Sequence, residues 1–145
     1  MPPRKDPLLN CRFRVEIDGI NQAGFREVFL ADSIIELIEY REGNDPSHIR
    51  KLPGLTRVGN VTLRLGMTDS MEVFRWYADT AAQGHANSSR NVVVIVMDEA
   101  GEDKARFVVR DAWPVKYSVG SLNAKGNDVL IETLELVNEG IERVS

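Results

Sequence analysis

The sequence predicts a mainly β fold, an antiparallel barrel or sandwich of about eight strands with one flanking α-helix. Three observations indicate this class. Short segments with alternating apolar and polar residues recur along the chain, clusters of turn-forming residues separate them, and one segment alone has a convincing helical period. The length of 145 residues suits one domain. We therefore expect residues 1–145 to form a single domain, with 1–9 as an extended N-terminal segment.

The predicted strands are short and half-buried. In the first of them, 11–18, Cys11, Phe13, Val15 and Ile17 point to one side and charged residues to the other. Further strands are expected at 25–31, 34–40, 61–65, 91–97, 105–110, 113–119 and 129–137. The last segment also has a helical period. We interpret it as a strand because its acidic residues are spread around every helical face.

One helix is expected from Asp69 to about Ala82. Asp69 and Glu72 have the spacing of a capping box, and Gly84 provides a stop. The predicted apolar stripe consists of Val73, Phe74, Tyr77, Ala78 and Ala81. We expect the helix to lie outside the barrel or sandwich, with Phe74 and Tyr77 buried against it.

A long loop or irregular arm is expected at 41–60, where glycine, proline, asparagine and aspartate interrupt the alternation. Loops of more than about 12–15 residues in a compact domain usually have a function or are disordered. We interpret 41–60 as an assembly arm that reaches a neighbouring subunit.

The sequence contains no recognisable catalytic or cofactor motif. His48 and His85 do not have metal-ligand spacing with other ligands, and Cys11 lies on the apolar side of a predicted strand. Glycine-rich phosphate-binding motifs are absent. Glu132 and Glu135 are close in sequence, and we interpret them as a solvated or interface-facing pair. We expect no enzymatic activity, no metal and no cofactor.

The composition also disfavours membranes and nucleic acids as targets. The longest wholly apolar run is 92–96, far below the roughly 20 residues of a membrane-spanning helix. The net charge is −4, which argues against a dedicated nucleic-acid binder and against attraction to a membrane surface.

Charge is distributed unevenly and suggests contacts between copies. The segment 41–64 holds five basic and two acidic residues. The acidic groups gather at 98–103 and again at 128–142. A basic arm and acidic patches on one chain suit head-to-tail association, although solvated charged faces would give the same pattern. The candidate interface residues are Arg50, Lys51, Leu52, Pro53, Gly54, Leu55 and Arg57, with Asp98, Glu99, Glu102, Asp103, Glu132 and Glu135 as acidic counterparts.

Several segments, taken in order along nearly the whole chain, resemble the T4-type phage tail tube protein family. They are 13–19, 50–55, 59–66, 122–127, 131–136 and 139–140, together with Phe74, Trp76 and Tyr77 in the predicted helix. The resemblance implies a β-barrel-like domain with a flanking helix, hexameric rings that stack into a hollow tube, and no catalysis. Such tubes belong to phage tails and to extracellular contractile injection particles.

The resemblance also implies partners and a location. These are further copies of the chain, a contractile sheath protein, baseplate and tube-terminating proteins, and a cargo of effector protein or DNA in the lumen. Assembly in the bacterial cytoplasm would precede a final place in a virion tail or a released particle. One alternative is a tube-end ring, an adaptor or a secreted ring of the type VI kind. Another is a small β-barrel binding domain or an unrecognised enzyme.

Overall fold

The computed structural model describes residues 6–10, 12–20, 24–41, 43 and 49–145. Within these residues the chain forms nine strands and one helix. In chain order they are β1 (Phe13–Ile17), β2 (Phe25–Phe29), β3 (Ser33–Tyr40), β4 (Arg50–Val58), β5 (Val61–Gly66), α1 (Glu72–Gln83), β6 (Arg90–Met97), β7 (Asp103–Val119), β8 (Ile131–Val137) and β9 (Gly140–Arg143). The prediction of a mainly β protein with one helix is confirmed. Cys11 and His48 lie outside the described residues.

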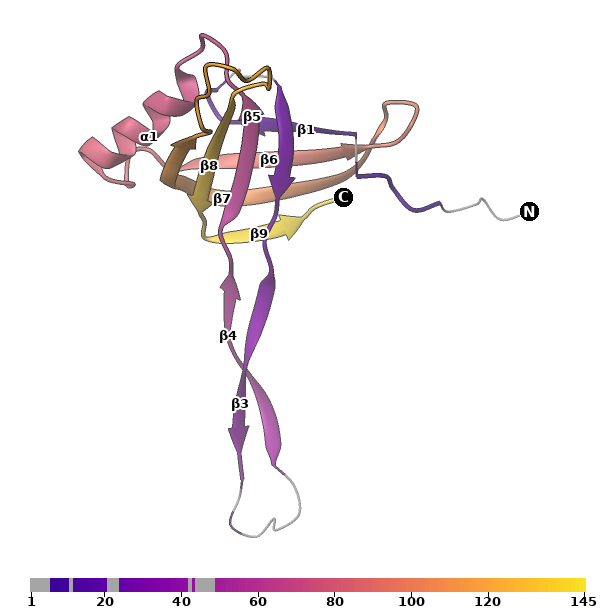
Figure 1. Ribbon diagram of the computed structural model, residues 1–145. Helices are drawn as coiled ribbons and strands as arrows, with labels where there is room; N and C mark the ends of the chain where they lie inside the picture. Colours follow the sequence, from indigo (N-terminus) through magenta and orange to yellow (C-terminus); the bar gives the residue numbers. More distant parts are fainter. Residues whose placement is uncertain (1–5, 11, 21–23, 42, 44–48) are drawn as a thin grey trace.

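Seven strands form one antiparallel sheet that makes up the body of the molecule (Figure 1). The strand order is β1-β6-β7-β8-β5-β2, and β9 also pairs with β7. These pairings leave β1 and β2 at the two ends of the order, so the described strands do not close into a barrel. The open ends leave backbone groups available for a neighbouring chain.

The long strand β7 joins the two halves of this sheet. Its first part pairs with β6 and β9, and its second part pairs with β8. Between the two parts Asp111 has a positive φ of 50°, and its backbone N–H donates to Asn91 Oδ1 at 3.1 Å. The sequence predicted two strands here. The structure instead has one strand that bends at Asp111, because Asn91 supports the unusual backbone.

The core lies on the inner side of the sheet. The alternation predicted for 61–65 is confirmed, since Val61, Leu63 and Leu65 are fully buried. Strand β8 confirms the strand interpretation of 129–137, with Leu134 and Leu136 buried beside them. The remaining buried apolar residues in the cluster are Ile17, Ile20, Val73, Trp76, Val92, Val94, Val109 and Ala112. The sequence missed β9, whose four residues are too few to show a period.

Helix α1 packs against the body through a different stripe from the one predicted. Val73, Trp76 and Thr80 are its buried residues, and Phe74 is 42% exposed, so the prediction of a buried Phe74 is wrong. Tyr77 is half-buried against the core. Trp76 takes the inner position because its indole N–H reaches the carbonyl oxygen of Ser88 at 2.6 Å. A buried tryptophan usually finds such an acceptor for its N–H.

The predicted capping box is also wrong. The helix begins at Glu72, its cap residue is Met71, and no side chain makes a capping hydrogen bond there. The backbone N–H of Glu72 instead donates to Ser70 Oγ at 3.5 Å. Asp69 lies outside the first turn of the helix. Gly84 ends the helix as predicted, and its N–H donates to the carbonyl oxygen of Thr80.

Most of the described residues in 41–60, the segment predicted as a loop, belong to strand β4. β4 pairs with β3 in a two-stranded hairpin that projects from the body, and we call this hairpin, residues 33–58, the arm (Figure 1). Pro53 and Gly54 misled the prediction because they normally interrupt strands. A two-stranded ribbon has only edge strands, where proline is tolerated. The register shifts between Ile35 and Leu37, where β4 has one extra residue.

Candidate assembly surfaces

The arm carries every residue of the predicted basic interface. Arg50, Lys51, Leu52, Pro53, Leu55 and Arg57 are exposed on β4, and Gly54 is half-buried. Gly54 faces β3 closely, since a Cβ there would lie 3.1 Å from Ile38 Cγ1 and from the Glu36 carbonyl oxygen. Arg57 forms an ion pair with Glu36 of the opposite strand. The structure therefore places these residues on one exposed ribbon.

The excess of basic over acidic residues that the sequence shows in 41–64 is absent from the arm as the structure defines it, residues 33–58. The segment 33–58 contains four basic and four acidic residues, because β3 adds Glu36 and Glu39 and the basic Arg64 lies in β5. The net charge of −4 thus belongs to the rest of the chain. Overall charge does not draw the arm to a partner, and its apolar side chains become the stronger candidates for contact.

The arm is fixed to the body at the junction between Ala31 and Asn60. The Gly59 N–H donates to the carbonyl oxygen of Asp32 at 3.0 Å, and Asn138 Nδ2 donates to the Gly59 carbonyl oxygen at 3.0 Å. Ala31 has a positive φ of 63°, which turns the chain from β2 into β3. These bonds connect the root of the arm to the body beside the end of β8.

The predicted acidic counterpart at 98–103 is a tight hairpin turn between β6 and β7. Asp98 Oδ1 accepts the backbone N–H groups of Ala100 and Glu102, both at 2.9 Å. Lys104 forms ion pairs with Asp98 and Glu102, at 3.8 and 3.4 Å. Three of the four carboxylates of this region, including Asp103, therefore have a cation from their own chain. In the described structure Glu99 is exposed and has no ion pair.

The carboxylate of Asp103 accepts two hydrogen bonds from the guanidinium group of Arg14 in β1. Arg14 Nη1 donates to Asp103 Oδ1 at 2.8 Å, and Nη2 donates to Oδ2 at 2.9 Å. These hydrogen bonds lower the pKa of Asp103 below its ordinary value. The contact ties β1 to the start of β7, next to β6.

Glu132 is wrongly predicted as an exposed counterpart. It is 2% exposed and lies on the inner side of β8, because the alternation of that strand puts Glu132 on the same side as Leu134 and Leu136. Tyr117 donates its hydroxyl hydrogen to Glu132 Oε2 at 2.5 Å. Burial, followed by this hydrogen bond, raises the pKa of Tyr117 to about 12. Sequence reasoning missed Tyr117, and the inward position of Glu132 was the available signal.

Glu135 is half-buried at the root of the arm. It accepts a hydrogen bond from Asn60 Nδ2 at 3.4 Å, and it lies opposite Thr62 of β5 and Lys116 of β7. The two glutamates that looked like a pair in the sequence thus point to opposite sides of the sheet. They share no site.

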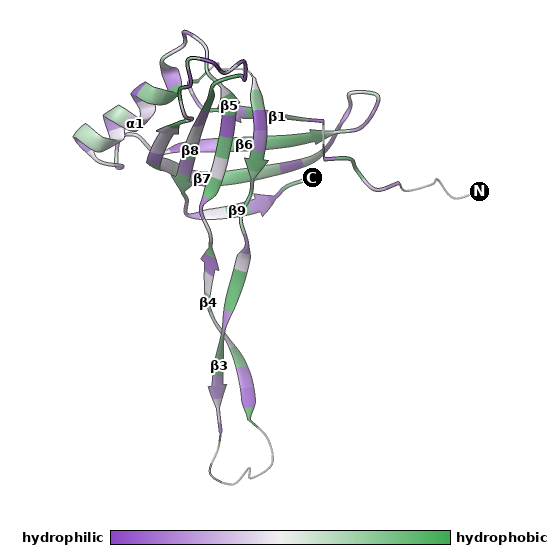
Figure 2. Cartoon of the chain, in the orientation of Figure 1, coloured by the Kyte–Doolittle hydropathy of each residue, from purple (hydrophilic) through white to green (hydrophobic). Residues whose placement is uncertain are grey.

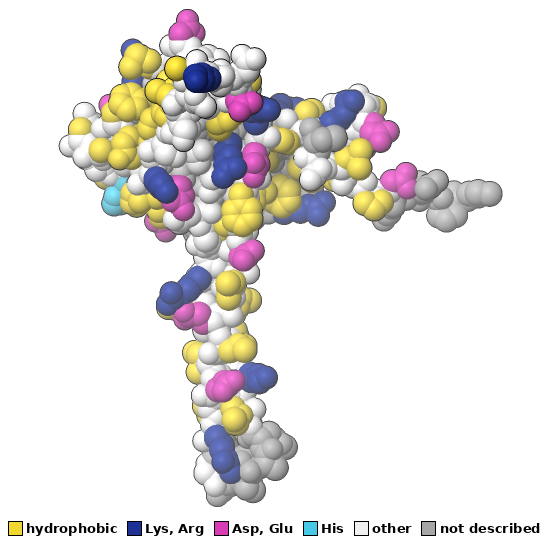
Figure 3. Space-filling model, viewed as in Figure 1, with side chains coloured by type: hydrophobic (Ala, Val, Ile, Leu, Met, Phe, Trp, Pro, Cys, Tyr) yellow, Lys and Arg dark blue, Asp and Glu magenta, His cyan; other side chains and the backbone are white. Residues whose placement is uncertain are grey.

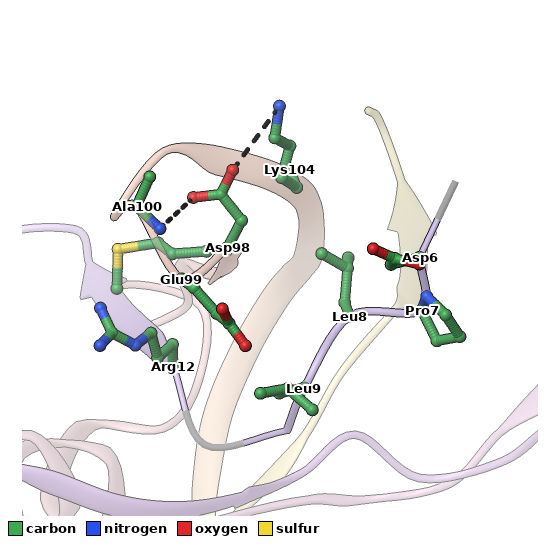
Figure 4. A pocket seen from close by; sticks show the side chains of 10 residues that line it. Asp6, Pro7, Leu8, Leu9, Arg12, Asp98, Glu99, Ala100 and Lys104 are labelled. Atoms are coloured by element: carbon green, nitrogen blue, oxygen red, sulfur yellow. Dashed lines mark hydrogen bonds and ion pairs between the residues drawn. The ribbon is translucent and has the colours of Figure 1, made fainter. Parts of the chain in front are cut away.

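A groove of about 620 Å³ lies between the N-terminal segment and the turn at 98–104 (Figure 4). Leu8 and Leu9 line one side of it, and Glu99 and Lys104 the other. Its lining mixes apolar groups with both signs of charge. No group of three or more His, Cys, Asp or Glu residues in the described ranges could hold a metal ion.

The described part of the chain has no helix long and apolar enough to cross a membrane. His85 stacks on Trp113 with 5.2 Å between the ring centroids, and the remaining aromatic contacts join Phe74 and Tyr77 to Tyr117. These contacts hold the helix and the loop after it against β7. None of these aromatic contacts places a nucleophilic side chain beside a base.

The described chain therefore consists of an antiparallel β body and a protruding two-stranded ribbon that exposes both apolar and charged side chains. The sequence model of one family, described as "T4-like virus tail tube protein gp19", matches residues 9–142. The chain therefore belongs to the T4-like tail tube protein family, and its function is that of a tube subunit. The resemblance inferred from the sequence is confirmed.

Solved structures support the same fold. A chain in the sheath–tube complex of the extracellular contractile injection system PVC is 25% identical, with a TM-score of 0.80 over 96% of this chain and 92% of that one. A chain in the tube-terminating cap of the anti-feeding prophage is 22% identical, with a TM-score of 0.84 over 99% and 94%. A type six secretion system protein is 10% identical, with a TM-score of 0.58 over 90% and 81%. The comparison with curated proteins gave no significant match.

Proposed function

We propose that this protein builds the hollow inner tube of a contractile injection machine by closing into hexameric rings that stack. The observation that carries the proposal is the arm, an exposed ribbon that projects from a body whose fold matches sheath–tube and cap structures along nearly its full length. The whole chain acts as one domain with a structural role and no reaction of its own, in keeping with its family.

The partners follow from the same proposal. The similar solved structures come from a sheath–tube complex, a baseplate and tube-terminating assemblies. We accordingly assign to this tube a contractile sheath, a baseplate and a terminating protein, with effector protein or DNA as cargo in the lumen. The tube is assembled in the bacterial cytoplasm and ends in a virion tail or an extracellular particle.

The arm is the main contact between copies in this proposal. Its exposed strand β4 carries Arg50 and Lys51, and the turn at 98–103 of another copy offers Glu99 as a carboxylate without an ion pair among the described residues. Ordering the arm costs conformational entropy, which burial in an interface offsets. Each exposed ion pair contributes only about 0.2–1 kcal/mol, so the charged contacts matter through their repetition around a ring.

The experiment compares assembly of three chains by sedimentation and negative-stain microscopy. The first is the wild type. In the second, residues 36–55 are replaced by Asn-Gly, which joins the cross-strand partners Ile35 and Thr56 by a two-residue hairpin turn. The third carries Arg50→Glu with Lys51→Glu. We expect tubes from the wild type alone, with unchanged circular dichroism of the body. Tubes from the shortened chain would show that the sheet edges suffice without the arm.

A second candidate function is a ring at the end of a tube. It is favoured by the TM-scores of 0.84 and 0.82 to chains in the cap of the anti-feeding prophage and in the PVC sheath/tube terminator. The two functions differ in the length of the assembly. A tube subunit forms tubes of open-ended length when concentrated, whereas an end ring stops at a single ring. The same micrographs distinguish them.

A further inference from the structure

A row of polar side chains crosses the face of the sheet that is turned away from the core, on strands β2, β5, β8 and the second part of β7. Glu27 lies opposite Arg64, and Arg64 lies opposite Thr133. Thr133 in turn lies opposite Ser118. Side chains that face each other on neighbouring strands are close enough to contact the same small ligand. The row therefore brings polar groups from these strands to one place on the surface.

A bulge in β2 adds Arg26 to this row. Phe25 pairs with Leu65. The next pair is Glu27 with Arg64, so β2 has one extra residue at position 26. A bulge of this kind redirects a side chain. Phe25 packs against the core, whereas Arg26 and Glu27 are both exposed, so the guanidinium groups of 26 and 64 lie on the same face.

These side chains line a groove of about 540 Å³. Arg26, Glu27 and Arg64 come from β2 and β5 at one side of it, and Ser118 and Thr133 come from β7 and β8 at the other. Hydrophilic and hydrophobic segments alternate along the strands of the body, and acidic and basic side chains lie beside one another on its surface (Figures 2 and 3). The side chain of Arg64 is 52% exposed, so an ion from solution can reach it.

The groove holds several hydrogen-bond donors that have no partner within the described chain. The side chain of Arg26 makes no ion pair or hydrogen bond there, and neither do the hydroxyls of Ser118 and Thr133. Arg64 contacts Glu27, with 3.4 Å between Nη1 and Oε2. That distance is long for a charge-assisted hydrogen bond, which is normally about 2.7–2.9 Å. These donors are therefore available to an anion.

A phosphate group suits these donors better than a carboxylate does. Guanidinium groups bind phosphate through paired N–H donors. A phosphate group has more acceptor oxygens than a carboxylate, and they point to different sides, so it can accept hydrogen bonds from several strands at once. It also carries more negative charge near neutral pH, which offsets the repulsion by Glu27.

We propose that Arg26 and Arg64 bind a phosphate group in this groove, beside the hydroxyls of Thr133 and Ser118, and that Glu27 weakens the binding. The site lies on the body and within one chain, so it forms whether or not the chain assembles through the arm. The ligand is a free phosphate compound or the phosphodiester backbone of a nucleic-acid strand, because both present the same oxygens to the arginines.

Binding is measured by phosphorus NMR, because the resonance of inorganic pyrophosphate broadens when the ion exchanges with a large protein. The whole chain is titrated at constant ionic strength, since salt screens exposed charges. Arg26→Gln and Arg64→Gln should each weaken binding by roughly fivefold or more, because each removes a charge-assisted hydrogen bond. Glu27→Gln should strengthen binding, because it removes a negative charge and the acceptor that competes for Arg64. All three side chains are exposed, and circular dichroism checks that the variants are folded.

Lys116→Gln is the matched control. Lys116 is exposed on the same face of the sheet, opposite Glu135 in the row next to that of Ser118 and Thr133. Its replacement removes the same charge as each arginine variant, but it should change the affinity by less than about twofold. An equal loss in the Lys116 and arginine variants would show that overall charge alone attracts pyrophosphate, and the site would be refuted.

Competition identifies the ligand. Inorganic phosphate should displace pyrophosphate from the wild type, and acetate at the same ionic strength should not. If a short oligothymidylate displaces it at a lower concentration of phosphate groups than inorganic phosphate does, the site binds a nucleic-acid strand. The reverse order assigns the site to a free phosphate compound. Equal displacement by acetate, or no broadening with the wild type, would overturn the proposal and leave the assembly of the tube untouched.

Discussion

The hydroxyl of Tyr117 donates a hydrogen bond to the buried carboxylate of Glu132 at 2.5 Å, between the neighbouring strands β7 and β8. The second oxygen of this carboxylate, Oε1, is buried and has no hydrogen-bond partner in the described structure. When a buried carboxyl group loses its hydrogen-bond donor, no interaction offsets the free energy that was needed to remove the group from water. Tyr117 therefore supports the fold through Glu132 as well as through its ring.

Replacing this hydroxyl should destabilise the protein measurably. Tyr117→Phe should reduce the free energy of unfolding by about 1–3 kcal/mol, because Glu132 is left buried without a donor. Tyr77→Phe is the matched control. Its ring stacks on Tyr117, and its hydroxyl makes no hydrogen bond in the described structure, so the change should stay within about 0.5 kcal/mol. Equal losses in chemical denaturation of the two variants would contradict the role of the Tyr117–Glu132 bond.

Alkaline pH should weaken the fold through the same residue. The pKa of Tyr117 is raised to about 12 in the folded state, compared with about 10 in an unfolded chain. Its contribution to stability is complete below about pH 10 and is lost as the pH rises through about 12. The stability of the wild type should fall across this window more steeply than that of Tyr117→Phe. Parallel curves from denaturation at stepped pH values would refute the assignment.

The helix should depend on Trp76 far more than on Phe74. Trp76 is 1% exposed and donates to Ser88, so Trp76→Ala should cost about 3–5 kcal/mol. Phe74 is 42% exposed and contacts Tyr117 edge-on, so Phe74→Ala should cost less than about 2 kcal/mol. Urea denaturation of both variants measures the difference. The reverse order would mean that the helix packs through the stripe that the sequence predicted.

Acid should break the contact between Arg14 and Asp103. Because the folded-state pKa of Asp103 is lowered, its contribution is complete above the unfolded value of about 3.9 and is lost as the pH falls through the lower folded value. Asp103→Asn should be less stable than the wild type near neutral pH, and the difference should shrink in acid. The effect is small because both side chains are exposed. A difference that stays constant down to about pH 2 would show that the charge is irrelevant.

Part of the regular fold could be predicted from alternation. Residues 61–65 have one buried side, and the period of two identifies this strand. Residues 129–137 also have a helical period, and the spread of acidic residues around every helical face identified them as the strand that the structure has at Ile131–Val137. The errors arose where contacts between residues distant in the sequence determine which side chains are buried. Trp76 takes the inner position because Ser88, twelve residues further along the chain, supplies an acceptor for its N–H. No local pattern contains that carbonyl group.

The candidate site was predicted in part. The sequence identified the arm residues from Arg50 to Arg57 and placed them correctly beyond the core, but it described as loop a strand whose partner, β3, lay in the preceding segment. Pro53 and Gly54, which normally interrupt strands, prevented the pairing of β3 with β4 from being predicted. Glu132 was predicted to be exposed because it is charged. The alternation of β8 instead puts it on the same buried side as Leu134.

The extra residue of β4 opposite Glu36 constrains how the arm can change in length during evolution. An insertion of one residue in a strand moves every later side chain to the opposite face. The irregularity absorbs one such residue, because β4 crosses three positions, from Pro53 to Thr56, while β3 crosses two, from Leu37 to Ile35. A further residue inserted in one strand alone needs a second irregularity, because otherwise the side chains between that point and the tip of the hairpin change faces. A relative with such a single insertion should therefore have a second shift of register in its hairpin.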